Sequence, residues 1–232
     1  MSPGDAPPRA DRNPADAPSR LDPSLRHPAA PTGTRRSRRA PVRQDGGVTL
    51  GFVRHGQTDW NLAGRLQGSS DIPLNDTGRQ QARDAVEVLR DHGDRWSAVV
   101  SSPLSRARET AEIIADGLGL ELGPSYHELI ERDYGEAEGV VEAEVERSWP
   151  GKSAPFIERL ESVVGRGLSG LERVAADYPD ADVVVVCHGT IIRYTLAEIA
   201  GRELPPIRNG AVSTVEHDGA AWDVTTVNDL PL

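Results

Sequence analysis

The sequence predicts an α/β fold, and within that class a three-layer α/β/α sandwich with a mostly parallel sheet, over residues 48–232. Two observations indicate this fold. Short apolar runs typical of strands alternate with stretches in which apolar residues recur every three or four positions, as on one face of a helix. In addition, the run at residues 183–186 is apolar on both faces, which is typical of a strand buried between two layers of helices.

The first half of this region contains two strand–helix pairs. An apolar run at residues 48–53 predicts the first strand, and an apolar stripe predicts a helix at residues 77–91. Residues 98–100 predict the second strand. The next apolar stripe predicts a helix at residues 104–118, which Gly119 would end.

The second half repeats the alternation and then changes to a hairpin. A long helix is expected from residue 160 to at least residue 171, and it precedes the buried strand at residues 182–187. A short helix at residues 191–200 follows, with Gly201 as its end. Two further strands separated by Asp218-Gly219 predict a closing hairpin, at residues 212–216 and 222–227.

Residues 1–47 differ in composition from the rest of the chain. They hold nine of the 18 prolines and nine arginines against five acidic residues, a net charge of +4, whereas residues 48–232 carry −14. The segment has no apolar periodicity, so it cannot bury enough surface to offset the entropy lost on ordering. We therefore expect a disordered, Pro- and Arg-rich N-terminal extension at residues 1–47, followed by one globular domain at residues 48–232.

The basic cluster at residues 35–39 allows several interpretations. Such a cluster can contact nucleic acid or an anionic membrane, or resemble a twin-arginine export signal. An export signal needs an apolar segment next, and residues 40–47 supply none. We favour a solvated tail, and we expect neither a nucleic-acid partner nor a membrane partner.

Cysteine use and hydropathy also limit the function classes. Cys187 is the only cysteine, which excludes an internal disulfide framework and a four-thiolate zinc site. No apolar stretch approaches the length of a transmembrane helix. We expect a cytoplasmic protein, and the sequence leaves its oligomeric state open.

Three polar signals follow predicted strands directly. Arg54-His55 follows the first strand, residues 101–106 follow the second and end with Arg106, and His188 follows the buried valine strand. Open α/β sheets bind ligands at the carboxyl ends of their strands, so we expect these residues to meet in one crevice. Taken singly, Arg106 fits a helix-surface charge and His188 fits a core histidine, but three such coincidences favour a site.

An arginine beside a histidine at a strand end suits phosphoryl chemistry. A neutral imidazole can attack phosphorus, while the adjacent guanidinium offsets the charge of the phosphate through fork-like hydrogen bonds. The segment 54–56, Arg-His-Gly, is weak evidence alone, because it also fits a solvated strand end.

Several motifs, in order and at characteristic spacings, resemble the histidine phosphatase superfamily, which includes the cofactor-dependent phosphoglycerate mutases. The resemblance covers nearly all of residues 48–229. The motifs are Arg54-His55-Gly56-Gln57-Thr58-x-x-Asn61, Asp71-Ile72-Pro73-Leu74-Asn75-x-x-Gly78-x-x-Gln81-Ala82, Ser101-Ser102-x-Leu104-x-Arg106-Ala107-x-x-Thr110-Ala111, Leu129-x-Glu131-x-x-x-Gly135-x-x-Glu138-Gly139 and His188-Gly189-x-x-Ile192-Arg193.

The resemblance implies a phosphoglycerate mutase-like fold and a role for each site residue. His55 would be the nucleophile, and Glu131 the proton donor and later the base. The substrate-binding residues would be Arg54, Arg106 and a protonated His188 as the phosphate cradle, Asn61 as a further phosphate contact, Gln67 and Gly68 near the pocket entrance, and Gly189 after the second histidine. Two arginines and a protonated histidine can offset a phosphomonoester dianion, so neither a metal nor another cofactor is expected.

Departures from the family pattern bear on the substrate. The aromatic residue that often precedes Glu-Gly is Ala137 here, and residues 151–154 replace a Gly-Glu-Ser motif. The connection at residues 140–155 is short and carries only two cations, whereas mutases resembling this fold use a longer, arginine-bearing insertion. We therefore expect a phosphatase that hydrolyses small phosphomonoesters. The alternatives are a 2,3-bisphosphoglycerate-dependent phosphoglycerate mutase and a non-catalytic module that binds phosphorylated ligands.

Overall fold

The computed structural model describes residues 47–93 and 95–232. The predicted N-terminal extension, residues 1–47, lies outside these described residues except for Gly47, so its disorder stays a prediction. No helix in the described part of the chain is long and apolar enough to cross a membrane.

The described residues contain a seven-stranded sheet with the order β3-β2-β4-β1-β5-β6-β7. The first four strands in this order run parallel, and β5, β6 and β7 are each antiparallel to the preceding neighbour. The strands are β1 (Val48–Arg54), β2 (Trp96–Ser101), β3 (Leu122–Ser125), β4 (Asp182–Cys187), β5 (Val212–His217), β6 (Trp222–Val227) and β7 (Leu230–Pro231).

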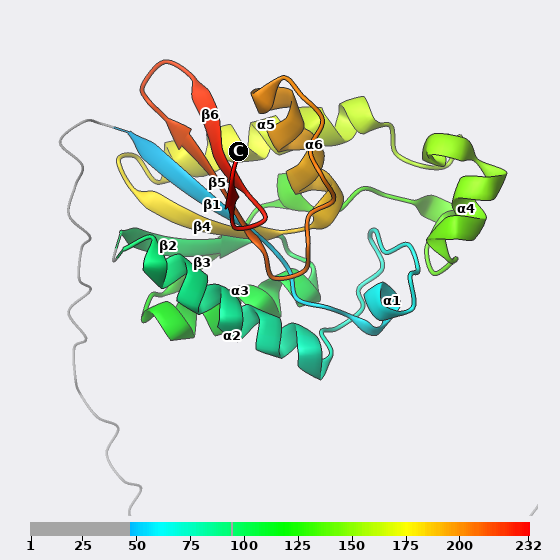
Figure 1. The fold of residues 1–232 in the computed structure, drawn as a ribbon, viewed down its shortest axis with the longest axis horizontal. Helices are drawn as coiled ribbons and strands as arrows, with labels where there is room; N and C mark the ends of the chain where they lie inside the picture. The colour runs from blue at the N-terminus through cyan, green and yellow to red at the C-terminus, as the bar shows by residue number, and fades with distance from the viewer. Residues whose placement is uncertain (1–46, 94) are drawn as a thin grey trace, which may run out of the picture. The chain divides into compact units, whose positions relative to one another are not determined.

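Helices cover both faces of the sheet (Figure 1), which confirms the predicted three-layer α/β/α sandwich. α2 and α3 share an apolar cluster with Val184 and Val186 of β4, whereas α5 and α6 share another with Val183 and Val185. β4 is therefore buried on both faces, as its valine run predicted. The helices are α1 (Asp59–Leu62), α2 (Asp76–Asp91), α3 (Ser105–Leu118), α4 (Glu142–Ser148), α5 (Leu160–Asp177) and α6 (Gly189–Ala200), with 3₁₀ turns at His127–Leu129, Gly135–Ala137 and Pro150–Lys152.

Most predicted element ends lie within a few residues of the observed ones. α3 ends at Gly119 and α6 at Gly201, where φ angles of 69° and 63° suit glycine, as predicted. α6 begins two residues earlier than expected. β3 was not predicted, because this edge strand has only four residues and includes Gly123 and Pro124.

A third, smaller apolar cluster includes residues of the short connection at residues 140–155. Leu66 N donates to Val140 O at 2.9 Å, and Arg65 pairs with Val141 in a β-bridge, so this segment attaches to residues 64–66. It contains α4, which was missed because Val145 is its only buried residue and gives no apolar stripe. The buried residues of the cluster are Leu66, Tyr134, Ala137, Val145, Ala154 and Ile157.

Candidate active site

The carboxyl ends of β1, β2 and β4 meet at one edge of the sheet, and the residues that follow them lie together. His55 N donates to Cys187 O at 2.9 Å, and Ser102 N donates to Val186 O at 2.9 Å. The imidazole rings of His55 and His188 have centroids 5.1 Å apart and are tilted by 61°. The three polar signals of the sequence therefore converge as predicted.

The imidazole of His55 is held in one tautomer. Its Nδ1 lies 2.7 Å from the carbonyl oxygen of Gly56, which can only accept, so Nδ1 carries the proton and Nε2 carries the lone pair. Arg106 Nε donates to this Nε2 at 3.3 Å. Burial, followed by the charges of Arg106 and Arg54, lowers the pKa of His55 well below 6.5. The side chain is therefore neutral near pH 7, as a nucleophile requires.

Arg106 lies in the first turn of α3, is fully buried and joins this helix to the loop at residues 68–70. Its two terminal nitrogens donate to Ser70 O at 2.9 Å and to Gly68 O at 2.7 Å. One end of the Gln67 amide lies 3.3 Å from this guanidinium, and the other lies 2.7 Å from Thr58 Oγ1. Gln67 is thus buried beside the arginine. Burial lowers the pKa of Arg106 to about 10, so it remains a cation.

Arg54 ends β1 and points its guanidinium toward the start of α6. One terminal nitrogen donates to Ile207 O at 2.6 Å, while the buried Nε has no hydrogen-bond partner among the described residues. A Cβ atom at Gly189 would lie 3.2 Å from this Nε, closer than most side chains tolerate. Glycine at this position therefore lets the guanidinium lie against the first turn of α6.

His188 is fully buried and bonded on one side only. Its Nε2 lies 2.8 Å from Ser102 Oγ, and its Nδ1 has no partner within the part of the chain that the structure describes. Burial, followed by the charge of Arg106 and by His55 and Arg54, lowers the pKa of His188 well below 6.5. Burial beside two arginines therefore disfavours the protonated form of His188 that the resemblance implied, because a third positive charge is unfavourable there.

Glu131 lies at the N-terminus of α6, directly beyond the second histidine. Its Oε2 accepts the N–H of Thr190 at 3.0 Å, and its Oε1 accepts those of Ile191 at 3.2 Å and Arg132 at 2.8 Å. Only 7% of the residue is exposed. A carboxylate suits this position, because the free N–H groups at a helix N-terminus point toward it.

The neighbouring glutamates have other partners. Glu128 Oε1 accepts from Arg173 at 2.6 Å, and Glu136 is exposed. Glu138 accepts the N–H groups of residues 69–70 at 2.8 and 2.7 Å. Burial opposes its ionised form, but these hydrogen bonds outweigh that effect and lower the pKa of Glu138. Glu138 thus makes a structural contact, and it fixes the loop that Arg106 also holds.

Asn209, which was not predicted from the sequence, connects Asn61 to the nucleophile. Asn61 Oδ1 accepts from Thr58 N at 3.2 Å and from Asn209 Nδ2 at 3.2 Å. The same Asn209 nitrogen also lies 2.9 Å from His55 O, so it links the two. Asn209 follows α6 in a loop that matches no motif, and no pattern in the sequence pointed to it.

Two glycines allow the loop after His55 to approach α2 closely. A Cβ at Gly56 would lie 2.1 Å from Gly78 O, and one at Gly78 would lie 2.1 Å from Gln57 O. Thr110 Oγ1 accepts the N–H of Gly56 at 3.1 Å from the opposite side. The backbone beside the nucleophile is therefore fixed by contacts that tolerate no larger side chain.

The two cations of the segment at residues 140–155 are already engaged. Lys152 Nζ pairs with Glu142 at 2.8 Å, and Arg147 Nε donates to Ala143 O on its own helix at 3.2 Å. Glu142 also contributes a charge that acts on Arg54, so it lies within electrostatic reach of the site. The side of the site that faces this segment is therefore not rich in free positive charge.

The donors in the site suit an anion. Within residues 47–93 and 95–232, no three His, Cys, Asp or Glu side chains are grouped so as to hold a metal ion. Arg54 Nε and His188 Nδ1 are instead buried atoms without a partner among these residues, and they lie close to a second arginine. Buried polar atoms are normally hydrogen-bonded, so a ligand that accepts hydrogen bonds fits here.

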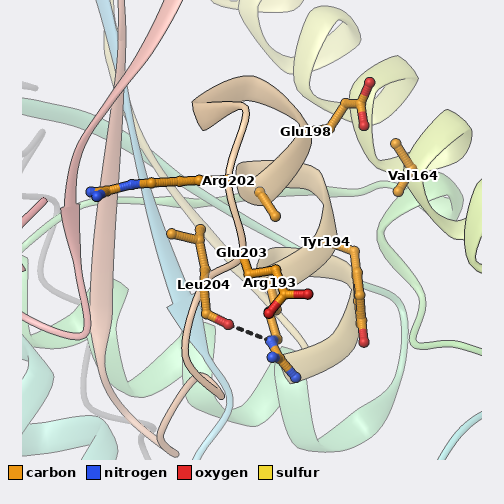
Figure 2. A pocket seen from close by; sticks show the side chains of 8 residues that line it. Val164, Arg193, Tyr194, Glu198, Arg202, Glu203 and Leu204 are labelled. Atoms are coloured by element: carbon orange, nitrogen blue, oxygen red, sulfur yellow. Dashed lines mark hydrogen bonds between the residues drawn. The ribbon is translucent and has the colours of Figure 1, made fainter. Parts of the chain in front are cut away.

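Two cavities lie beside these elements. The larger, of about 610 Å³, is lined by α2 and by residues 206–211, and Arg54 and Asn209 are among its lining residues. Figure 2 shows the other, of about 230 Å³, whose lining residues come from α5, α6 and the loop after α6. Arg193, the last residue of the second histidine motif, lines this cavity and donates to Leu204 O at 2.6 Å.

Comparison with known families agrees with this arrangement. Residues 50–230 match the family described as the histidine phosphatase superfamily (branch 1). An uncharacterized phosphatase, PhoE, of Bacillus subtilis is 41% identical over 181 residues, which cover 76% of this chain and 92% of that protein. The phosphoglycerate mutase-like protein 4 of Arabidopsis thaliana is 34% identical over 193 residues, covering 77% of this chain and 84% of that protein.

Solved structures show the same fold. A mycobacterial glucosyl-3-phosphoglycerate phosphatase, solved as a complex with VO3, superimposes with a TM-score of 0.68 and 28% identity. The match covers 78% of this chain and 98% of that one. The predicted phosphoglycerate mutase-like fold is therefore confirmed.

Proposed function

The chain belongs to the histidine phosphatase superfamily, and from this membership we propose that it is a phosphatase that hydrolyses small phosphomonoesters through a phosphohistidine on His55. The observation that carries the proposal is the state of His55. Its Nε2 lone pair faces Arg106, while its Nδ1 proton is bound by Gly56 O. A neutral imidazole with its lone pair beside a buried cation is arranged to attack a phosphate that the cation holds.

Substrate binding would satisfy the unpaired groups of the site. The phosphate oxygens would accept from Arg54 Nε and from His188 Nδ1, which are buried and without partners. Two arginines would offset most of the charge of a phosphate dianion, and burial strengthens this attraction. Asn61 and Gly189 lie beside these groups and would complete the cradle.

In the first step, His55 Nε2 attacks phosphorus and the bond to the alcohol oxygen breaks. Arg106 Nε would then transfer its hydrogen bond from Nε2 to a phosphate oxygen, where negative charge is concentrated. The Nδ1–H···O bond to Gly56 keeps the ring oriented and stabilises the positive charge that the imidazole acquires.

Glu131 would donate a proton to the departing alcohol oxygen and then take one from the water that cleaves the phosphohistidine. Both of its oxygens already accept backbone N–H groups, so the proton would share an oxygen with one of these donors. This geometry fixes the carboxyl group in place for both steps. The products are the alcohol, inorganic phosphate and the neutral His55.

The charges of the segment at residues 140–155 support hydrolysis over phosphoryl exchange. A mutase must hold a second anionic group, but Lys152 is paired with Glu142 and Arg147 is bonded to its own helix. The relative of 41% identity carries a phosphatase name, whereas a relative of 34% identity carries a mutase-like one. A mutase and a non-catalytic binding module remain the competing functions.

The substrate class includes sugar phosphates, phosphoglycerate derivatives and nucleotide-pathway intermediates. Among similar proteins, one is named a glucosyl-3-phosphoglycerate phosphatase and another, of 31% identity, a metal-independent phosphoserine phosphatase from Arabidopsis thaliana. Independence from metals and a cytoplasmic location stay predictions.

A screen of these metabolite phosphates, with phosphate release followed in the presence of EDTA, tests the proposal. The wild-type protein should release phosphate from at least one class, and His55→Ala should not. If vanadate binds but no phosphate is released from any substrate, the binding-module function is correct instead.

A further inference from the structure

We propose that Arg166, on α5, is a positioning residue for the acid and base Glu131, and that Glu158 in turn orients Arg166. The inference rests on the proposed function, because it assumes that Glu131 transfers a proton. Neither Arg166 nor Glu158 belongs to the motifs that the sequence analysis singled out.

All five N–H donors of the Arg166 guanidinium have acceptors. Its Nε donates to Glu158 Oε1 at 2.9 Å, and one terminal nitrogen donates to Glu128 O and to Ile130 O, both at 2.8 Å. The other terminal nitrogen donates to Glu131 O at 3.1 Å and to Glu158 Oε2 at 2.9 Å. A guanidinium has five such donors in a rigid plane, so its position is fully determined.

Three of these acceptors are main-chain carbonyl groups of the segment at residues 128–131, and the last belongs to Glu131 itself. A single side chain, 20% exposed, therefore fixes the backbone from which the carboxyl group projects. Lysine has three rotatable donors on a flexible stem and cannot reproduce this geometry. The planar fork, as well as the charge, is needed.

Glu158 fixes the chain on the other side of Glu131. Asp133 N donates to Glu158 Oε2 at 3.1 Å, and Glu158 N donates to Asp133 O at 2.8 Å. Ser162 Oγ donates to Glu158 Oε1 at 2.8 Å. Burial disfavours the ionised carboxylate, but its hydrogen bonds to Arg166, Asp133 and Ser162 outweigh this and lower the pKa of Glu158. The pair thus stays charged and holds both flanks of Glu131.

The main chain and the side chain of Glu131 are held by different helices. Arg166 of α5 holds the backbone, whereas the first N–H groups of α6, at Thr190 and Ile191, hold the carboxylate. The two helices pack in one apolar cluster. Loss of the Arg166 contacts would let the backbone of Glu131 move and shift its carboxyl group from the reacting position, and a shift near 1 Å can slow proton transfer about 100-fold.

The same helix offers a matched control in Arg173. This residue donates to the Glu128 side chain at 2.6 Å and is 58% exposed, and within the described part of the chain it donates to no carbonyl group near Glu131. Replacing Arg173 removes a similar cation and ion pair from the same helix. Any effect seen with Arg166 but absent with Arg173 therefore belongs to the contacts with the main-chain carbonyl groups of residues 128–131.

The test compares Arg166→Lys, Glu158→Gln and Arg173→Gln with the wild type on two substrates. One substrate is an alkyl phosphate, whose leaving group needs a proton, and the other is an aryl phosphate, whose leaving group needs it less. Arg166→Lys should lower kcat for the alkyl phosphate about 10- to 100-fold and for the aryl phosphate by a few-fold. Glu158→Gln should lower kcat in the same direction. Arg173→Gln should change kcat for neither substrate by more than about 2-fold. Vanadate inhibition should stay within about 3-fold throughout, because the phosphate cradle is untouched.

A double variant separates positioning from general stability. If Arg166 acts through Glu131, then Arg166→Lys in a Glu131→Gln background should cost less than about 2-fold for the alkyl phosphate, because the acid is already lost. Equal losses on both substrates, or a full additional loss in the double variant, would overturn the inference while leaving the phosphatase function intact. If Glu131→Gln itself shows no dependence on the leaving group, then Glu131 is not the acid and both proposals about it fail. Thermal midpoints of all variants show which of them remain folded. If Arg166→Lys does not fold, the kcat values of Glu158→Gln on the two substrates test the inference instead.

Discussion

Ser102 Oγ lies 2.8 Å from His188 Nε2, within hydrogen-bond distance, and links the loop after β2 to the second histidine. The hydroxyl oxygen also accepts the N–H of Leu104 at 3.4 Å, and we expect its own proton to be donated to Nε2. The proton of the neutral ring would then lie on Nδ1, the buried nitrogen that has no partner among the described residues. In that arrangement Ser102 presents His188 as a hydrogen-bond donor toward the proposed phosphate site.

We predict that Ser102→Ala weakens phosphate binding more than it slows chemistry. Loss of the hydroxyl frees the tautomer of His188 and leaves Nε2 unsatisfied, at a cost of about 1–3 kcal/mol. The inhibition constant for vanadate should rise about 5- to 100-fold, and nitrogen NMR of the labelled ring should show a mixture of tautomers. Ser101→Ala is the control, because Ser101 is also buried but its Oγ faces Ser125. A tautomer unchanged in Ser102→Ala would contradict this role.

His55 should carry the phosphoryl group during turnover. The lone pair on its Nε2, which faces Arg106, and its lowered pKa motivate this prediction. Rapid quenching without acid, followed by peptide mass spectrometry, should find phosphate on the peptide that contains His55. Activity of His55→Ala should fall to background, because the site contains no second proposed nucleophile. Phosphate on His188 would reverse the assignment.

Gly56→Ala should destabilise the protein by about 1–3 kcal/mol, because an added methyl group would overlap the backbone of α2. The new Cβ would lie 2.1 Å from Gly78 O, and backbone cannot move aside as a flexible side chain can. The matched control is Gly165→Ala on α5, where nothing lies within 4 Å of the added atom. This control should stabilise the helix by about 0.5–1 kcal/mol. Urea denaturation measures both, and equal effects would refute the steric argument.

Stability should decline below about pH 6.5 because of the buried histidines. Burial and the neighbouring arginines lower the pKa values of His55 and His188 in the folded protein, whereas the unfolded chain titrates near 6.5. Below that pH the unfolded chain binds protons that the folded protein does not. Each histidine therefore lowers the free energy of unfolding by up to about 1.4 kcal/mol for each pH unit that the pH falls. Urea denaturation at pH 7.5 and 5.5 gives the loss in free energy of unfolding between the two values. This loss should be smaller in His188→Asn than in the wild type, by on the order of 1 kcal/mol. Identical losses would mean that the pKa of His188 is the same in the folded and unfolded states.

The parts of the fold that the sequence predicted are those with strong local signals. The valines of β4 predicted a buried central strand, and Gly119 and Gly201 predicted helix ends, because each signal depends on a few neighbouring residues. The convergence of Arg54, Arg106 and His188 could also be predicted, since it needs only the parallel order of three strands. α4 could not, because most of its surface is exposed.

The sequence alone could not select the acid among neighbouring glutamates. Glu131 was chosen only through a family resemblance, since Glu128 and Glu138 lie nearby in the chain. The contacts that distinguish Glu131 come from Thr190 and Ile191, 59 and 60 residues away. The neutral state of His188 could not be predicted either, because it follows from burial beside two arginines that only the folded chain brings together.

Net hydrolysis should exceed phosphoryl exchange between phosphoglycerate positions. A mutase needs cations for both ends of a bisphosphate, but Lys152 Nζ is bound to Glu142 at 2.8 Å and Glu142 lies within electrostatic reach of Arg54. The negative charge of Glu142 disfavours a second phosphate. The measurement supplies 3-phosphoglycerate with catalytic 2,3-bisphosphoglycerate and follows both 2-phosphoglycerate and free phosphate. Free phosphate should be the main product, and Glu142→Gln, which releases Lys152, should strengthen inhibition by the bisphosphate more than inhibition by vanadate. If isomerisation outruns phosphate release by a large factor in the wild type, the mutase function replaces the phosphatase function.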